Sequence, residues 1–278
     1  MTTMLSPRRS DAEVTPRFSG MKVTQPRVIL SEWTKFRSLR STLITLLVSV
    51  VLTIGLGALI SAVTASHWPH ASAGDRAGFD AVVTSLNGVR ISQLAVGVLG
   101  VLLISGEYAT GMIRASLTAV PKRLPVLWAK LSVFTGVVGI VSVVSTFIAF
   151  FVGQAMLSSQ NLQVTLGSPN ALRMVIGAGV YLLLVGLIGM ALGALLRNTA
   201  AGISSLVALF FVIPPVLDLL PKSWSNNIGP YLPSTAGEAF WGRPDVAHLS
   251  AISGLLVLCA WAAAAIAAAA VRLKRQDA

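Results

Sequence analysis

The sequence predicts an all-α membrane protein with six transmembrane helices and a preceding amphipathic helix at the membrane interface. Hydrophobic residues make up 54% of the 278-residue chain, and charged residues make up only 11%, against about 25% in soluble domains. Several long runs carry no charged side chain, and about 20 mostly apolar residues suffice for a helix to cross a bilayer. The uncharged runs are residues 41–66, 91–106, 131–172, 174–196, 198–217 and 249–271.

The placement of basic residues predicts the topology. If both termini and the connections around Arg114 and Arg197 share one side, that side holds 16 of the 21 Lys and Arg residues. Such a bias is typical of the cytoplasmic side. The net charge of +11 therefore follows topology and favours anionic lipids as partners, with no nucleic acid expected.

Residues 1–24 carry little apolar periodicity and are predicted to form a disordered cytoplasmic tail. Residues 25–40 are predicted to form an amphipathic helix at the interface, with Pro26 in its first turn. Glu32 falls inside the apolar arc, where a carboxylate is costly unless it is paired. It either meets a basic or donor group, such as Arg114 or a partner subunit, or snorkels to water. The arc comprises Val28, Ile29, Trp33, Phe36 and Leu39.

Six spans fill residues 41–271. The fourth span ends at Arg197 and the fifth begins almost at once, which predicts a tight turn between antiparallel helices. Pro214 and Pro215 must kink or stop the fifth helix. The predicted spans are residues 41–65, 87–106, 126–153, the run ending at 196, the run from 198 to about 217, and 249–271, with an external cap at 214–248 and a cytoplasmic tail at 272–278.

Other motifs carry less weight. Gly189 and Gly193 form a GxxxG pattern, which serves either packing within the chain or a dimer seam. Cys259 is the only cysteine and lies in the last span, so a disulfide framework within the chain is excluded. His67, His70 and His248 are too scattered to predict a metal site.

Residues 106–123 read GEYATGMIRASLTAVPKR and connect the second and third spans. Tyr108, Met112, Ala115 and Ala119 recur at helical spacing, so a short amphipathic helix at the inner membrane face is expected. The alternative is a solvated connector.

Three segments in this order resemble type-2 ABC exporter permeases, especially short bacterial ones without a fused ATPase. They are SEWTKFRS before the first span, GEYATGMIRASLTAVPKR after the second, and YLPSTAG before the sixth. The resemblance implies an elbow helix at 25–40, a coupling helix within 107–120 and a bacterial cell membrane, with both termini cytoplasmic. It also implies two copies of an ABC ATPase subunit and a second permease copy or homologue as partners.

The chain itself supplies no phosphate loop, because Met112 stands where the lysine would follow the glycine spacing of residues 106–111. ATP and magnesium are therefore expected on the partner, and no cofactor, metal or catalytic residue is expected here. The resemblance implies ATPase docking by Glu107, Tyr108, Arg114, Thr118 and Glu32, and an external gate at Pro214, Pro215 and Asp218.

The expected function is an exporter permease that works by alternating access. The spans hold almost no ionisable group, which argues against proton coupling and for an apolar or amphipathic cargo such as a drug, lipid or peptide. Polar uncharged residues are the candidates for the path, although Ser and Thr often bond their own backbone: Gln93, Ser142, Ser145 and Thr146.

Two alternatives belong to other classes. A membrane scaffold or sensor without transport activity fits the same composition. An intramembrane enzyme needs a nucleophile with a base, or a metal, at membrane depth, but the sequence contains no HExxH or GxSxG motif.

Overall fold

The computed structural model describes residues 24–112, 123–243 and 249–275, and within these ranges every regular element is helical. The predicted tail at 1–23, the segment containing Arg114 and Thr118, and the last residues of the chain lie outside the described residues. The amphipathic helix predicted within 107–120 falls mostly in that second gap and stays a prediction.

Six helical stretches of the described residues are long and apolar enough to cross a membrane, which confirms the all-α class and the expected number of candidate spans. They are α2, α4 with α5, α7, α8, α9 to α10, and α13. The helices are α1 (Gln25–Ser38), α2 (Arg40–His67), η1 (Trp68–His70), α3 (Ala73–Gly78), α4 (Ala81–Leu86), α5 (Val89–Ala109), α7 (Arg123–Leu157), η2 (Ser158–Gln160), α8 (Ala171–Leu196), α9 (Thr199–Val207), η3 (Ala208–Val212), α10 (Ile213–Asp218), α11 (Lys222–Ile228), η4 (Gly229–Tyr231), α12 (Pro233–Trp241) and α13 (Ala251–Arg275).

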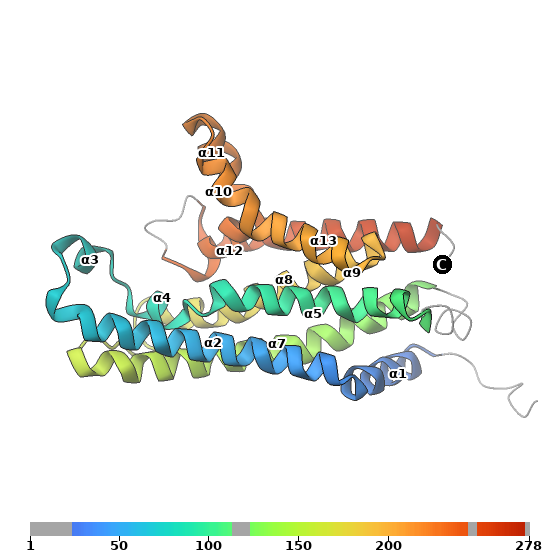
Figure 1. Cartoon of the computed structure of the whole chain (residues 1–278), viewed down its shortest axis with the longest axis horizontal. Coiled ribbons are helices and arrows are strands. Elements are labelled where there is room, and N and C mark those ends of the chain that lie inside the picture. The colour runs from blue at the N-terminus through green and yellow to red at the C-terminus, as the bar shows by residue number, and fades with distance from the viewer. Residues whose placement is uncertain (1–23, 113–122, 244–248, 276–278) are drawn as a thin grey trace, which may run out of the picture.

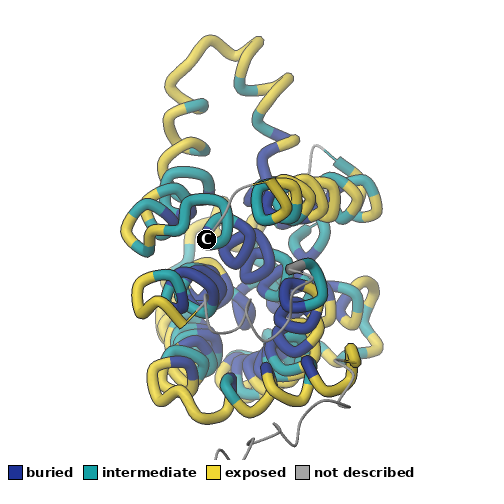
Figure 2. The backbone as a smooth tube through the Cα atoms, turned by 90° about the vertical axis from the view of Figure 1, so that its right-hand side faces the viewer, coloured by how far each residue is buried: buried dark blue, intermediate teal, exposed yellow. Residues whose placement is uncertain are grey.

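Helices α2, α5, α7 and α8 run side by side along the long axis of the molecule, with α1 at one end and α3 at the other (Figure 1). Helices α10 and α11 project from this bundle. In the view of Figure 2, the projecting part is mostly exposed, while the buried residues gather in the centre of the bundle. We refer to the two ends of the bundle as the α1 end and the α3 end.

Local sequence explains where several helices begin and end. Leu39 has an extended backbone and separates α1 from α2, so the first helix ends two residues before the predicted boundary at residue 40. Arg197 adopts a left-handed conformation, and the Asn198 side chain caps α9 by accepting from the Ala201 amide, so the predicted tight turn is confirmed.

The prolines of the fifth span are accommodated without ending it. The chain widens into a π-helical turn at Ala208–Val212, and Pro214 and Pro215 then fall in the first turn of α10. Proline is tolerated in a first helical turn because its missing N–H would have no partner there. The helix therefore ends only at Asp218.

The contact between α5 and α8 depends on glycine. A Cβ atom at Gly189 would lie 2.2 Å from the carbonyl oxygen of Gly97, and one at Gly100 would lie 2.1 Å from the carbonyl oxygen of Gly186. Small residues let helix backbones approach this closely. Gly193 approaches the Val101 carbonyl in the same way, so the GxxxG pattern serves packing within the chain.

This packing predicts that Gly189→Ala lowers the free energy of unfolding by about 1–3 kcal/mol, because the added methyl overpacks the α5–α8 contact. Thermal unfolding in detergent measures the effect. Gly136→Ala is the matched control, since Gly136 lies in α7 with no atom within 4 Å of the added Cβ and alanine favours helices. Equal effects of the two substitutions would contradict the packing argument.

Candidate functional site

The α1 end contains a buried cluster of two carboxylates and two ammonium groups, which we call the Glu–Lys cluster: Glu32, Lys35, Glu107 and Lys130. Three helices supply it, since Glu32 and Lys35 belong to α1, Glu107 to the end of α5, and Lys130 to α7. The side chains of Glu32, Glu107 and Lys130 are 6%, 8% and 4% exposed. Helix α1 packs there through Val28, which lies against Val126 and Ala129 of α7.

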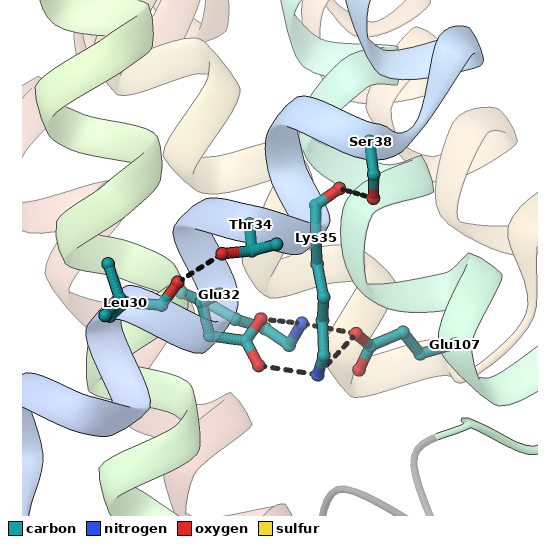
Figure 3. Close-up of polar contacts among 7 residues, drawn as sticks. Leu30, Glu32, Thr34, Lys35, Ser38 and Glu107 are labelled. Carbon is teal, nitrogen blue, oxygen red and sulfur yellow. Dashed lines mark hydrogen bonds and ion pairs between the residues drawn. The ribbon is translucent and has the colours of Figure 1, made fainter.

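Lys130 is the centre of this cluster. Its Nζ lies 2.5 Å from Glu32 Oε2 and 2.6 Å from Glu107 Oε1. Lys35 adds a second bridge, with its Nζ 2.7 Å from Glu32 Oε1 and 3.5 Å from Glu107 Oε1. Figure 3 shows Lys35 pointing between the two carboxylates, from the same face of α1 as Glu32. The cluster is neutral overall, which is the condition for burying charges.

The carboxylates of Glu32 and Glu107, which face the Lys35 ammonium group, keep it protonated. Burial lowers the pKa of Lys35, but the hydrogen bond to Glu32 and the charges of Glu107 and Glu32 outweigh it, so the pKa lies above its usual value. Lys35 therefore stays charged at neutral pH. Glu107 Oε2 is buried and accepts no hydrogen bond from the described residues.

The sequence placed Glu32 correctly and missed its partner. The expected basic group on another element is Lys130, whereas the suggested Arg114 lies outside the described residues. Lys130 is the only charged residue in the predicted third span, residues 126–153. A lysine in such a place needs an acidic partner, and this requirement was the signal in the sequence that pointed to a pair with Glu32. Lys130 is an exception to the expectation that the spans hold almost no ionisable group, since it is buried within the Leu124–Gln160 stretch.

Further contacts connect this end to the rest of the bundle. The guanidinium carbon of Arg197, the residue that follows α8, lies 5.2 Å from the centre of the Tyr108 ring. The hydroxyl oxygens of Ser105 and Thr199 share a hydrogen bond of 2.9 Å between α5 and α9. Arg272 of α13 donates to the Leu195 carbonyl. The end of α5 is thus attached to the turn between α8 and α9.

Towards the α3 end, a cavity of about 500 Å³ separates α5 from α10 and α11. We call it the α5–α10 cavity. It brings together residues that the sequence assigned to two functions: Gln93, from the predicted path, and Pro214, Pro215 and Asp218, from the predicted gate. Gln93 accepts a hydrogen bond from the Tyr181 hydroxyl.

The other path candidates lie elsewhere. The Ser145 hydroxyl donates a hydrogen bond of 2.7 Å to the Val141 carbonyl, and the Thr146 hydroxyl donates one of 2.8 Å to the Val143 carbonyl. Both therefore make the local backbone bonds that the sequence left open as the alternative. Ser142 is buried on the same helix, α7, and none of the three lines the α5–α10 cavity.

Arg90 and Glu238 form an ion pair of 2.9 Å beside this cavity. The Arg90 guanidinium also lies 5.8 Å from the Trp241 ring centroid. Burial raises the pKa of Glu238 above its usual value of 4.5, and the charge of Arg90 offsets part of that increase. The pair joins α5 to α12, while Arg173 of α8 donates to the Phe240 carbonyl at the end of α12.

The chain matches no model of a protein family, and no curated protein sequence is similar to it.

The Glu–Lys cluster predicts a large penalty for removing one charge. Lys130→Met should lower the free energy of unfolding by about 3–5 kcal/mol, because it leaves two buried carboxylates to share the single cation Lys35. The quadruple variant Glu32→Gln, Lys35→Gln, Glu107→Gln, Lys130→Met should lose less than the single variant, since it removes all four charges of the cluster together. Chemical denaturation of both variants in detergent measures this order, and the reverse order would refute it.

The raised pKa of Glu238 predicts a pH dependence. A carboxyl group whose folded pKa is raised contributes stability that is present below its unfolded pKa and is lost as pH rises through the folded pKa. The wild type should therefore lose stability relative to Glu238→Gln as pH rises from 4.5. Melting temperatures of both proteins across this range measure the difference, and parallel curves would contradict it.

Proposed function

We propose that this protein is the permease subunit of an ATP-driven exporter in a bacterial cell membrane. The observation that carries the proposal is that one continuous helix, α5, holds Glu107 of the Glu–Lys cluster at one end and Arg90 of the α5–α10 cavity at the other. At 1.5 Å per residue, these two positions lie about 25 Å apart along the helix, close to the thickness of a hydrocarbon core. A movement at one end of a rigid helix is transmitted to the other.

The proposal places the Glu–Lys cluster at the cytoplasmic membrane surface, with α1 as the elbow helix. Trp33 and Leu30 of α1 are 42% and 64% exposed, so they are available to insert among lipids. The basic residues of the α1 end support this orientation. Both termini are then cytoplasmic, and α10 to α12 form a cap on the outer side.

The partner ATPase docks on the segment that follows α5. Because Glu32 and Glu107 are buried, they act in this proposal as positioning residues rather than as contacts for the partner. They hold α1, the end of α5 and the start of α7 together, so that a push on the 107–120 segment moves three helices as one body. A second permease copy completes the path for an apolar or amphipathic cargo.

The hydrolysis of ATP is assigned to the partner, since Met112 replaces the lysine that a phosphate loop requires. An ATPase with a phosphate loop, encoded by a neighbouring gene and purified together with this protein, would supply the motor. ATP-dependent uptake of a fluorescent amphiphile by inside-out vesicles that contain both proteins tests the proposal. Nucleotide hydrolysis by the purified chain alone, or accessibility of residues 107–120 from the outer face, would overturn it.

The proposed coupling predicts that Glu107→Gln lowers the ATP-dependent transport rate about tenfold, which corresponds to a typical coupling energy of 1–3 kcal/mol. The variant should still fold, because Lys130 keeps its contact with Glu32. Asp75→Asn is the control, since it removes a carboxylate from the exposed helix α3. Equal transport rates for the two variants would show that Glu107 has no part in coupling.

A further inference from the structure

The α5–α10 cavity has a smaller neighbour, and both are lined by Arg90, Thr235 and Glu238. The smaller cavity has a volume of about 200 Å³ and lies against Trp241 and Gly242 of the α12 end. The Arg90 and Glu238 side chains are 50% and 39% exposed, so a molecule in the cavities can reach both. The larger volume of about 500 Å³ is within the range of pockets that bind small molecules.

Two buried polar atoms beside these cavities have no hydrogen-bond partner among the described residues: Ser234 Oγ and Trp241 Nε1. Ser234 lines the larger cavity and is 8% exposed, while Trp241 lines the smaller and is 1% exposed. Such groups are nearly always satisfied in folded proteins. Indole N–H only donates and a hydroxyl can donate, so each of these two cavity-lining residues has a hydrogen bond left to donate.

The wall opposite the ion pair is apolar. Phe210, Phe211, Pro214 and Pro215 line the larger cavity on the side of η3 and α10. The apolar surface continues outside it, where Val212 and Val216 are each 49% exposed. A ligand with a polar head and an aliphatic tail can therefore place its head at Arg90 and Glu238 and its tail along α10.

Charge balance decides the kind of head group. The linings carry both signs of charge, Arg90 and Arg243 together with Asp218 and Glu238. A monoanion that binds Arg90 competes with Glu238 for it, and a monocation at Glu238 competes with Arg90, because these two side chains already pair at 2.9 Å. A zwitterion exchanges one ion pair for two. We propose that these cavities bind the head group of a zwitterionic phospholipid, with its phosphate on Arg90 and its ammonium group on Glu238.

This inference goes beyond the proposed function and is tested on the purified chain without ATPase or transport. The probes are short-chain phosphatidylethanolamine, phosphatidylglycerol, diacylglycerol of the same chain length, and free phosphoethanolamine. Equilibrium binding to delipidated protein in detergent should favour phosphatidylethanolamine about tenfold over the other three, the ratio expected for one charge-assisted contact. Preference for phosphatidylglycerol, or equal binding of all four, would overturn the proposal.

Glu238→Gln provides the decisive variant, because it frees Arg90 while removing the site for the ammonium group. Phosphatidylglycerol should then bind at least as tightly as phosphatidylethanolamine, a reversal that a structural role of Glu238 would not produce. Ser234→Ala should weaken phosphatidylethanolamine binding several-fold without lowering the melting temperature, since the hydroxyl has no partner to lose among the residues that the structure describes. Asp75→Asn is the charge-matched control outside the cavities, and unchanged lipid selectivity in Glu238→Gln would refute the assignment.

Discussion

The need to neutralise buried charge determines how the α1 end is built. Lys130 is almost fully buried in an apolar helix, and an ammonium group in such a place requires carboxylates within contact distance. Glu32 and Glu107 meet that requirement from α1 and α5. The position of α1 against the bundle, and of the α5 end against α7, therefore depends on one electrostatic condition that no apolar contact could impose with the same specificity.

Backbone proximity imposes the second condition, along the length of α5. Glycines on both helices let α5 and α8 approach until carbonyl oxygens occupy the space of a Cβ atom. This contact joins α5 to α8 over the length that lies between the Glu–Lys cluster and the α5–α10 cavity. In contrast, the fifth span has a π-helical turn followed by two prolines, features that interrupt regular hydrogen bonding. A regular α-helix thus faces a helix with a π-helical turn and two prolines across the cavity.

Charged groups at the α3 end also neutralise each other, but some buried polar atoms there have no hydrogen-bond partner among the described residues. Arg90 and Glu238 neutralise each other, and Arg173 satisfies the last carbonyls of α12. Ser234 and Trp241 nevertheless retain a buried polar atom without a partner among the described residues. The α1 end is closed around its charges, whereas the α3 end keeps open volume beside its ion pair.

The sequence alone determined the helical class, the six apolar stretches and several boundaries, because hydropathy, proline and capping residues act over a few neighbouring positions. Residues 113–122 lie outside the described structure, so the predicted coupling helix stays a prediction. Only the tertiary structure decided that Glu32 pairs with Lys130 and that Gln93, Pro214 and Asp218 share a cavity. These groupings join residues far apart in the chain, and local patterns carry no information on which distant side chains will meet. A buried charge needs a partner of opposite sign, but the packing of the helices determines which residue that partner is.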